Sequence, residues 1–163
     1  MQLKKLPAIT AAMRHSKYCI RRALEKFSSV QLRKIQDVEG DTGCFLITTY
    51  RNAETARKVN LALRAEGIVT LPQGISNVVM TDWGLHLYYN NVSLVKKRSV
   101  DPGGFPWKLS ENAGMEHSYE KGTCPVADGL FERSILIPIP SCLKEQDEDD
   151  IIHAFEKVLP VCL

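Results

Sequence analysis

The sequence predicts an α+β domain, and three observations carry the prediction. Apolar residues recur at helical spacing over the first 27 residues and again near the C-terminus. Two short runs, residues 44–50 and 134–140, are rich in β-branched or aromatic residues typical of strands. An asparagine and a glycine bracket a further helical pattern, as helix ends commonly require. Helices and short strands are therefore both expected.

Length and composition suit one globular domain. The chain has 163 residues, of which 44% are apolar and 25% are charged, so a real core is expected. No apolar run is long enough to cross a bilayer, and no secretory signal pattern is visible. The five cysteines are scattered and form no CxxC pair, which favours neither a disulfide framework nor a zinc site. We expect a cytoplasmic protein that does not interact with membranes.

Charge is uneven along the chain. Residues 1–34 hold nine Lys/Arg against one acid, Glu25, while acids gather at the start of the last helical pattern: Glu145, Asp147, Glu148, Asp149 and Asp150. A basic helix can bind nucleic acid, but few aromatic residues interleave with these charges and no known binding motif surrounds them. We expect a solvated or interface surface and no nucleic-acid partner.

The first half of the chain predicts a helix, a strand and a second helix. The first helix begins at Leu3 or Pro7 and ends near Phe27, with this apolar stripe: Leu6, Ile9, Met13, Ile20, Leu24 and Phe27. A turn at 40–43 leads to a strand at 44–50. Asn52 caps a helix that reaches about residue 66, its buried face holding Ala56, Val59 and Leu63. Gly67 ends that helix, and residues 68–71 begin another extended stretch.

The second half begins with an irregular region at residues 72–123. It holds both tryptophans, some helix near residues 85–95 and a strong turn signal at 101–104, and a connection of this length indicates a functional loop. Pro125 opens a short helix to about residue 132. The strand "SILIPIP" follows, and its prolines predict an edge position or a strand end. The last helix spans residues 145–159, with its acids where the helix dipole favours negative charge.

Catalytic motifs are missing from this sequence. It contains no GxGxxG, GxxxxGK[ST], HExxH or GxSxG pattern. Ser141-Cys142 lacks a neighbouring base, and the four histidines are dispersed. We therefore predict no catalytic, cofactor-binding or metal-ligating residues in this chain.

The ordered set of segments nevertheless resembles one family. The basic helix at "QLKKLPAI", the segment "NAETARKVNLALRAEGIVT", a long variable region, and "CPVADGLFERSILIPIP" before an acidic-start helix are similar to the C-terminal part of the DegT/StrS family. These are pyridoxal-phosphate-dependent sugar aminotransferases with the aspartate aminotransferase type of fold. The resemblance covers nearly the whole chain and is sharpest at residues 124–127.

The resemblance implies that residues 1–163 form a single small C-terminal domain, with residues 1–30 as the domain-linking helix. It implies a small antiparallel sheet with helices packed on one face, as in fold-type I pyridoxal-phosphate enzymes. In the family, the Schiff-base lysine and the carboxylate facing the pyridinium nitrogen lie upstream of the matched region, so the large cofactor domain is absent here. We expect the chain to be inactive alone. The complete enzyme would use pyridoxal phosphate, an amino-acid donor and a keto-sugar expected to be nucleotide-linked, as a homodimer or with a partner cofactor domain.

Candidate substrate contacts lie in the irregular region. Amide and imidazole groups can hydrogen-bond sugar hydroxyls, and aromatic rings can stack on a pyranose. The candidates are Trp83, His86, Tyr88, Asn90 and Asn91, with Trp107 in second rank. The alternative is that Trp83 and Tyr88 fill core and that His86 is a satisfied polar residue.

Two other functions stay open. The chain could be a non-enzymatic α+β module that binds a ligand or partner through residues 72–123. It could also be a nucleic-acid binder that uses the basic first helix, which predicts salt-sensitive binding.

Overall fold

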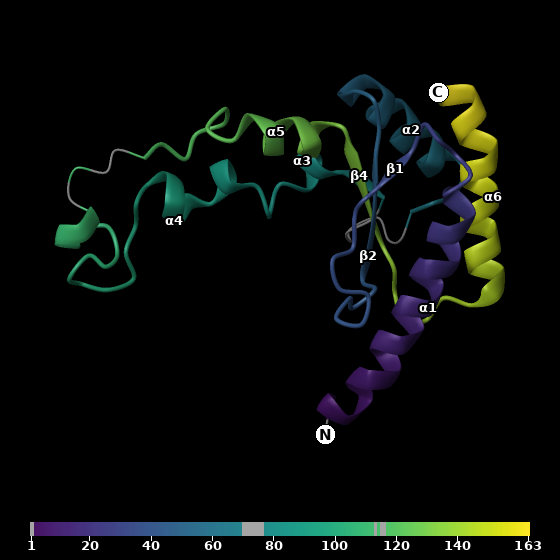
Figure 1. Cartoon of the computed structure of the whole chain (residues 1–163), viewed down its shortest axis with the longest axis horizontal. Helices are drawn as coiled ribbons and strands as arrows, with labels where there is room; N and C mark the ends of the chain where they lie inside the picture. The colour runs from purple at the N-terminus through teal and green to yellow at the C-terminus, as the bar shows by residue number, and fades with distance from the viewer. Residues whose placement is uncertain (1, 70–76, 113, 115–116) are drawn as a thin grey trace.

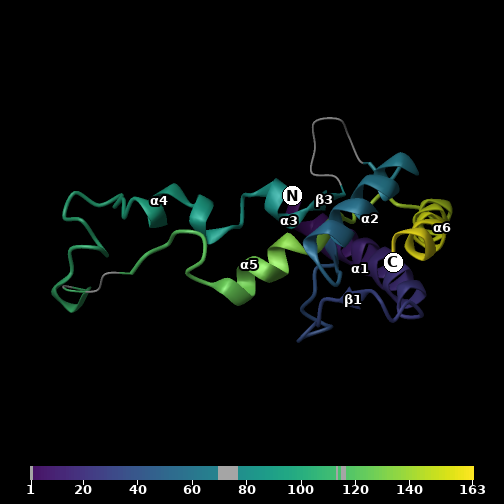
Figure 2. The ribbon, with the colours of Figure 1, turned by 90° about the horizontal axis from the view of Figure 1, so that it is seen from above.

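The computed structural model describes residues 2–69, 77–112, 114 and 117–163. Figure 1 shows two parts: a body in which long helices pack on a small sheet, and an arm that extends from the body between α3 and α5. Seen from above in Figure 2, the arm again lies away from the body. Both chain termini belong to the body.

The sheet has four antiparallel strands in the order β1-β2-β4-β3 in the part of the chain that is described. They are β1 (Gln31–Leu32), β2 (Phe45–Thr49), β3 (Val78–Val79) and β4 (Ser134–Pro138). The β2–β4 pair is the longest, with Ile47 opposite Leu136 and Thr49 opposite Ser134. The predicted α+β class with a small antiparallel sheet is confirmed.

Three long helices cover one face of this sheet: α1 (Leu6–Leu24), α2 (Ala53–Ala65) and α6 (Glu145–Cys162) (Figure 1). The core between them holds alternate residues of the strands together with the inner faces of the helices. Its fully buried members include Ile20, Leu24, Leu46, Val59, Leu63, Ile135 and Phe155. The predicted buried face of α2 is confirmed, because Ala56, Val59 and Leu63 are all inaccessible.

The ends of α2 form for the predicted reasons. The Asn52 side chain accepts a hydrogen bond of 2.8 Å from the backbone N–H of Thr55, which satisfies a donor that the first turn leaves unpaired. Gly67 has φ +92°, in the left-handed region that glycine adopts without strain. Helix α5 likewise spans Pro125–Glu132, as predicted from its first-turn proline.

Helix α1 differs from its prediction in length and in burial. It ends at Leu24 rather than at Phe27, and a short 3-10 turn (Gln2–Lys5) precedes it. Its first turns do not pack into the core, since Leu6 is 52% exposed and Ile9 is 38% exposed. Figure 1 shows the reason: the N-terminal turns extend past the end of the sheet that the rest of the helix covers. Four residues of the predicted apolar stripe lie in the core or pack against it, and only Leu6 and Ile9 are exposed.

Strand β4 corrects a second expectation. Its prolines predicted an edge position or a strand end, and β4 lies inside the sheet between β2 and β3. Pro138 is the last residue of the strand, so the strand-end alternative is right and the edge alternative is wrong. Two other strands, β1 and β3, were not expected. Ile68 and Val69 form no strand, and residues 70 and 71 of that predicted stretch lie outside the described residues.

The arm consists of short helical turns joined by irregular chain. It leaves the sheet through α3 (Met80–Trp83), continues through η2 (Tyr88–Asn90), α4 (Val92–Val95) and η3 (Ser110–Asn112), and returns through α5. The predicted turn at 101–104 forms, with the N–H of Gly104 donating to the carbonyl of Asp101 at 3.0 Å. The predicted helix near 85–95 is two short turns. None of the described helices is long and apolar enough to cross a membrane.

Candidate functional site

The predicted substrate contacts divide among three places: the root of the arm, the local turns beside it, and the tip of the arm. Trp83 and His86 belong to a chain of rings at the root. The ring centroid of Trp83 lies 5.9 Å from that of Phe45 on β2 and 4.5 Å from that of His86. The His86 ring in turn meets the Phe131 ring of α5 edge to face, with 5.3 Å between their centroids. These rings attach α3 and α5 to the sheet face opposite the three long helices.

Three ring nitrogens of this cluster are buried without hydrogen bonds among the described residues. They are the indole nitrogen of Trp83 and both ring nitrogens of His86. Burial also lowers the pKa of His86, because a charged imidazolium is poorly solvated there. The neutral ring therefore dominates near pH 7, and both residues act as packing groups in this conformation.

Tyr88 serves as a clasp between the two ends of the arm. Its hydroxyl donates to Asp128 Oδ2 at 3.0 Å and accepts from the backbone N–H of Cys124 at 3.1 Å. Asp128 also accepts from the N–H of Gly122 at 2.8 Å, although its side chain is almost fully buried. The outgoing and returning segments are thereby held together at the point where the arm meets the body.

The two asparagines are engaged in local turns. Asn90 donates through Nδ2 to the carbonyl of Gly84 at 3.0 Å. Asn91 accepts through Oδ1 from the N–H groups of Ser93 and Leu94 and so caps α4. Both side chains therefore hydrogen-bond the local backbone. Both residues are also exposed, so a ligand could still reach them.

Trp107 lies apart from the other five residues, at the tip of the arm. Its indole N–H donates to the carbonyl of Arg98 at 3.1 Å, and its ring meets Tyr119 edge to face at 6.0 Å. Tyr119 belongs to the returning segment, so this pair joins the two sides of the tip. The structure thus brings Trp83 with His86 and places Trp107 in a separate site.

A groove runs along the sheet face that the long helices leave uncovered. It encloses about 400 Å³ between β1, β2 and α5, and Ile47, Met80, Leu130 and Phe131 provide most of its apolar wall. Arg33 and Lys34 add two cations to its lining. An apolar groove beside cations suits a protein surface that carries apolar side chains and carboxylates.

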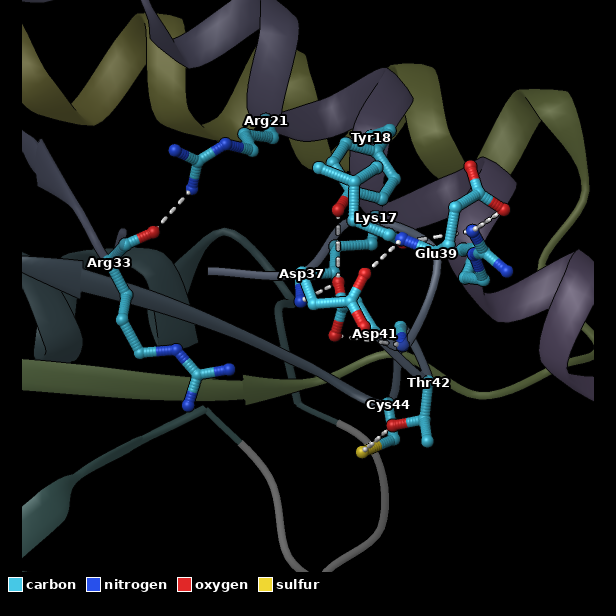
Figure 3. Close-up of polar contacts among 12 residues, drawn as sticks. Lys17, Tyr18, Arg21, Arg33, Asp37, Glu39, Asp41, Thr42 and Cys44 are labelled. Atoms are coloured by element: carbon cyan, nitrogen blue, oxygen red, sulfur yellow. Dashed lines mark hydrogen bonds and ion pairs between the residues drawn. The ribbon is translucent and has the colours of Figure 1, made fainter. Parts of the chain in front are cut away.

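The basic residues of α1 face a different partner. Figure 3 shows that Lys17 and Arg21 contact the chain that follows β1, through Asp41 and the carbonyl of Arg33 respectively. Lys17 is only 3% exposed, and its ammonium lies 2.6 Å from Asp41 Oδ2. Tyr18 donates to the same oxygen at 3.2 Å, and the backbone N–H of Gly43 donates to Oδ1 at 3.3 Å. The Lys17–Asp41 ion pair is therefore buried, and both carboxylate oxygens of Asp41 accept hydrogen bonds.

The electrostatics of Asp41 follow from that geometry. Burial alone would raise the pKa of the carboxyl, but the hydrogen bonds from Lys17, Gly43 and Tyr18 outweigh it and hold the pKa below its usual value. Gly43 is required here, because its φ is +78° and a Cβ would lie 2.4 Å from the backbone nitrogen of Arg14. Nearby, Arg14 donates to the carbonyl of Val38 at 2.8 Å.

Sequence reasoning missed the two acids of these networks. Asp128 lies between Pro125 and the strand, where it looks like an ordinary helix-start acid, and Asp41 lies in a glycine-flanked turn. Neither position carries a local signal for its partner 24 or more residues away. The described residues also contain no group of three or more His, Cys, Asp or Glu side chains that could hold a metal ion.

Comparisons with known proteins give no family. A scan against protein-family models finds no match, and a search of curated proteins finds none either.

The described residues do not fit pyridoxal phosphate. The cofactor needs a lysine amine in a cavity, a carboxylate for its ring nitrogen and donors for its phosphate. Lys17 is the one buried lysine of the described chain, and Asp41 already holds its amine. None of the described cavities is lined by Lys17, and the four lysines that do line described cavities are all exposed residues: Lys34, Lys58, Lys97 and Lys157.

Proposed function

We propose that this chain is the substrate-side small domain of a pyridoxal-phosphate-dependent sugar aminotransferase of the DegT/StrS type. In this proposal a separate cofactor-binding domain supplies the lysine and the phosphate site. The chain itself contributes one wall of the cleft in which a keto-sugar, expected to be nucleotide-linked, receives an amino group from an amino-acid donor. The proposal rests on the ordered segments that resemble the family and on one structural observation, a body whose apolar surface is incomplete on two sides.

The first incomplete side is formed by the first turns of α1 and the 3-10 turn before it. Leu3, Leu6 and Ile9 follow one stripe and are 82%, 52% and 38% exposed. Apolar residues that recur along one helix face but remain exposed are typical of a helix that packs on a further domain. The family resemblance assigns the domain-linking helix to this same segment.

The second incomplete side is the groove beside α5. Its apolar wall would cover part of a neighbouring domain, and Arg33 and Lys34 would meet carboxylates on that domain. The arm root lies next to this groove, since Phe131 belongs both to the groove and to the ring cluster. A domain seated in the groove would therefore also contact the predicted substrate residues Trp83 and His86.

The decisive experiment supplies the missing part. The full chain is co-expressed with a cofactor-binding domain encoded beside it, and the pair is analysed by size-exclusion chromatography with light scattering and by an amino-transfer assay on keto-sugar nucleotides. We expect a stable complex that transfers nitrogen from glutamate or glutamine. The chain alone, treated with pyridoxal phosphate and borohydride, is expected to yield no stoichiometric lysine adduct.

Two exposed aliphatic positions give matched variants for this experiment. Leu130 lines the groove and is 40% exposed, whereas Val161 lies on α6 and is 75% exposed. Leu130→Arg is expected to weaken the complex by about tenfold or more, because an unpaired charge would be buried at the joint. Val161→Arg is expected to leave it unchanged. Equal effects of the two variants, or a chain that forms the lysine adduct by itself, would contradict the proposal.

A non-enzymatic binding module is the second candidate, and one observation favours it. The cavity at the arm tip is lined by residues of this chain alone, so it needs no second domain. This reading expects a stable monomer that binds a ligand in isolation. Sedimentation of the purified chain at high concentration separates the two, because the first candidate expects self-association through its uncovered apolar sides.

A further inference from the structure

The tip of the arm contains a partly open cavity of about 240 Å³. Its lining is Lys97, Pro106, Trp107, Asn112, His117 and Tyr119. Figure 1 shows the tip far from the sheet and the long helices, so this cavity is independent of the groove and of the ring cluster at the arm root. None of the described residues that line it is acidic.

Hydrogen bonds give the cavity a fixed frame. The indole N–H of Trp107 is anchored on the Arg98 carbonyl, and Asn112 Nδ2 donates to the carbonyl of Pro106 at 2.8 Å. The Ser99 hydroxyl accepts from the N–H of Asp101 at 3.0 Å, which closes the loop that carries Pro106. A frame of this kind holds the aromatic walls in place before any ligand arrives.

The two aromatic walls present ring surface to the cavity. Trp107 and Tyr119 meet with an interplanar angle of 76°, so the edge of one ring lies against the face of the other. Such a corner can take a flat aromatic ring by stacking on one wall and edge contact with the other. Tryptophan and tyrosine at an exposed tip, away from the core, are also the side chains that recognition sites use most.

Cationic and hydrogen-bonding groups complete the lining. Lys97 has φ +46°, an uncommon conformation for a residue with a side chain, and its N–H donates to the carbonyl of Leu94 at 3.1 Å. No described carboxylate lies within ion-pairing distance of the Lys97 ammonium. His117 can donate a hydrogen bond to an anion in either protonation state.

The geometry points to a binding site for a small ring-bearing phosphate, of the chemical class of nucleoside monophosphates. The ring would occupy the Trp107–Tyr119 corner, and the phosphate would be held by Lys97 and His117. The cavity is just below the usual size of drug-binding pockets, about 300 Å³ or more, which matches one ring system with one anionic group. This site would bind whether or not the chain joins a cofactor domain.

Nuclear magnetic resonance of the full chain tests the site directly. The protein has two tryptophans, so a nitrogen–proton spectrum contains two indole signals. Trp107 is hydrogen-bonded at the tip, whereas Trp83, whose indole nitrogen is buried, lies at the arm root and serves as the internal control. Titration with AMP, UMP and phenyl phosphate is expected to shift the Trp107 signal and to leave the Trp83 signal in place. Adenosine, ribose 5-phosphate and inorganic phosphate are expected to bind at least about tenfold more weakly than AMP, because adenosine lacks the phosphate and the other two lack an aromatic ring.

Matched variants assign the contacts. Lys97→Gln is expected to weaken AMP binding by about tenfold, and Lys96→Gln, the adjacent lysine outside the cavity, by less than about twofold. Trp107→Leu is expected to weaken it by about tenfold, whereas Trp107→Phe keeps a ring and most of the affinity. The Trp83 signal reports that each variant stays folded.

Four outcomes would overturn the proposal. The first is that none of the three ring-bearing phosphates shifts the Trp107 signal. The second is that inorganic phosphate binds as tightly as AMP, which would remove the ring from recognition. The third is equal weakening by Lys97→Gln and Lys96→Gln, which would reduce binding to a diffuse charge effect. The fourth is that Trp107→Leu binds AMP like the unmodified chain.

Discussion

Replacing Lys17 with methionine removes one member of the buried pair that joins α1 to the β1–β2 connection. The change keeps the length of the side chain but leaves the Asp41 carboxylate, only 10% exposed, with Tyr18 and Gly43 as its remaining donors. Breaking a buried pair in this way costs about 3–5 kcal/mol. For a chain of this size, about 3 kcal/mol corresponds to a fall in melting temperature of about 6–12 °C.

The double variant Lys17→Met/Asp41→Asn separates charge from packing. An asparagine at position 41 can still accept from the N–H of Gly43, and no charge is left buried, so the double variant is expected to be more stable than Lys17→Met alone. Arg14→Gln is the surface control, because its ion-pair partner Glu39 is 91% exposed and such pairs contribute about 0–1 kcal/mol.

Urea unfolding followed by circular dichroism measures all of these variants. The free energy of unfolding should rank unmodified chain, Arg14→Gln, the double variant and then Lys17→Met. Equal losses for Lys17→Met and Arg14→Gln, or a double variant no more stable than the single one, would refute the reasoning. Acid gives an independent check: the pKa of Asp41 is lowered, so its contribution is present above the unfolded pKa of about 3.9 and is lost as pH falls through the folded value. Asp41→Asn should therefore flatten the fall in stability at the acid end of the profile.

Three further predictions follow from the arm root and from α2. Because burial lowers the pKa of His86, the unfolded chain binds the imidazole proton more tightly, and the stability of the fold should fall as pH drops below about 6.5. In thermal melts from pH 8 to pH 5.5, His86→Phe should weaken this dependence of the melting temperature on pH. An unchanged pH dependence would count against the role of His86. Tyr88→Phe removes the hydroxyl that donates to Asp128, which should lower the free energy of unfolding by about 1–3 kcal/mol and speed amide hydrogen exchange at the base of the arm. Unchanged protection of these amides from exchange would exclude the clasp. Asn52→Ala removes the acceptor for Thr55 and should cost about 1 kcal/mol in urea unfolding, against which Asn52→Gly should cost only a few tenths of that.

Elements with local chemical signals were predictable from the sequence. Helix α2 has a capping asparagine at one end and a left-handed glycine at the other, and both act within a few residues of the chain. Strand β2 and helix α5 also matched their predictions, because β-branched composition and a first-turn proline are local properties. Strands β1 and β3 have only two residues each, which is too short for any periodic pattern.

Properties that depend on distant partners were not predictable. The exposure of Leu6 depends on where the sheet ends, not on the helix that carries it. Trp83 and His86 were candidates for ligand contacts with packing as the alternative, and the structure shows them in a ring cluster that requires Phe45 and Phe131. The setting of Trp107 arises only because the returning chain brings a second ring to it. Which of these residues touches a substrate stays a prediction.

The clasp at Tyr88 has a consequence for how this protein can change over evolutionary time. Because the chain departs and comes back at one point, everything beyond that point is topologically a closed loop on a finished scaffold. Insertions, deletions or wholesale exchange of the arm would leave the sheet and its long helices unaffected. Descendants of this sequence could therefore acquire new recognition properties by remodelling the arm, without paying in scaffold stability for each trial.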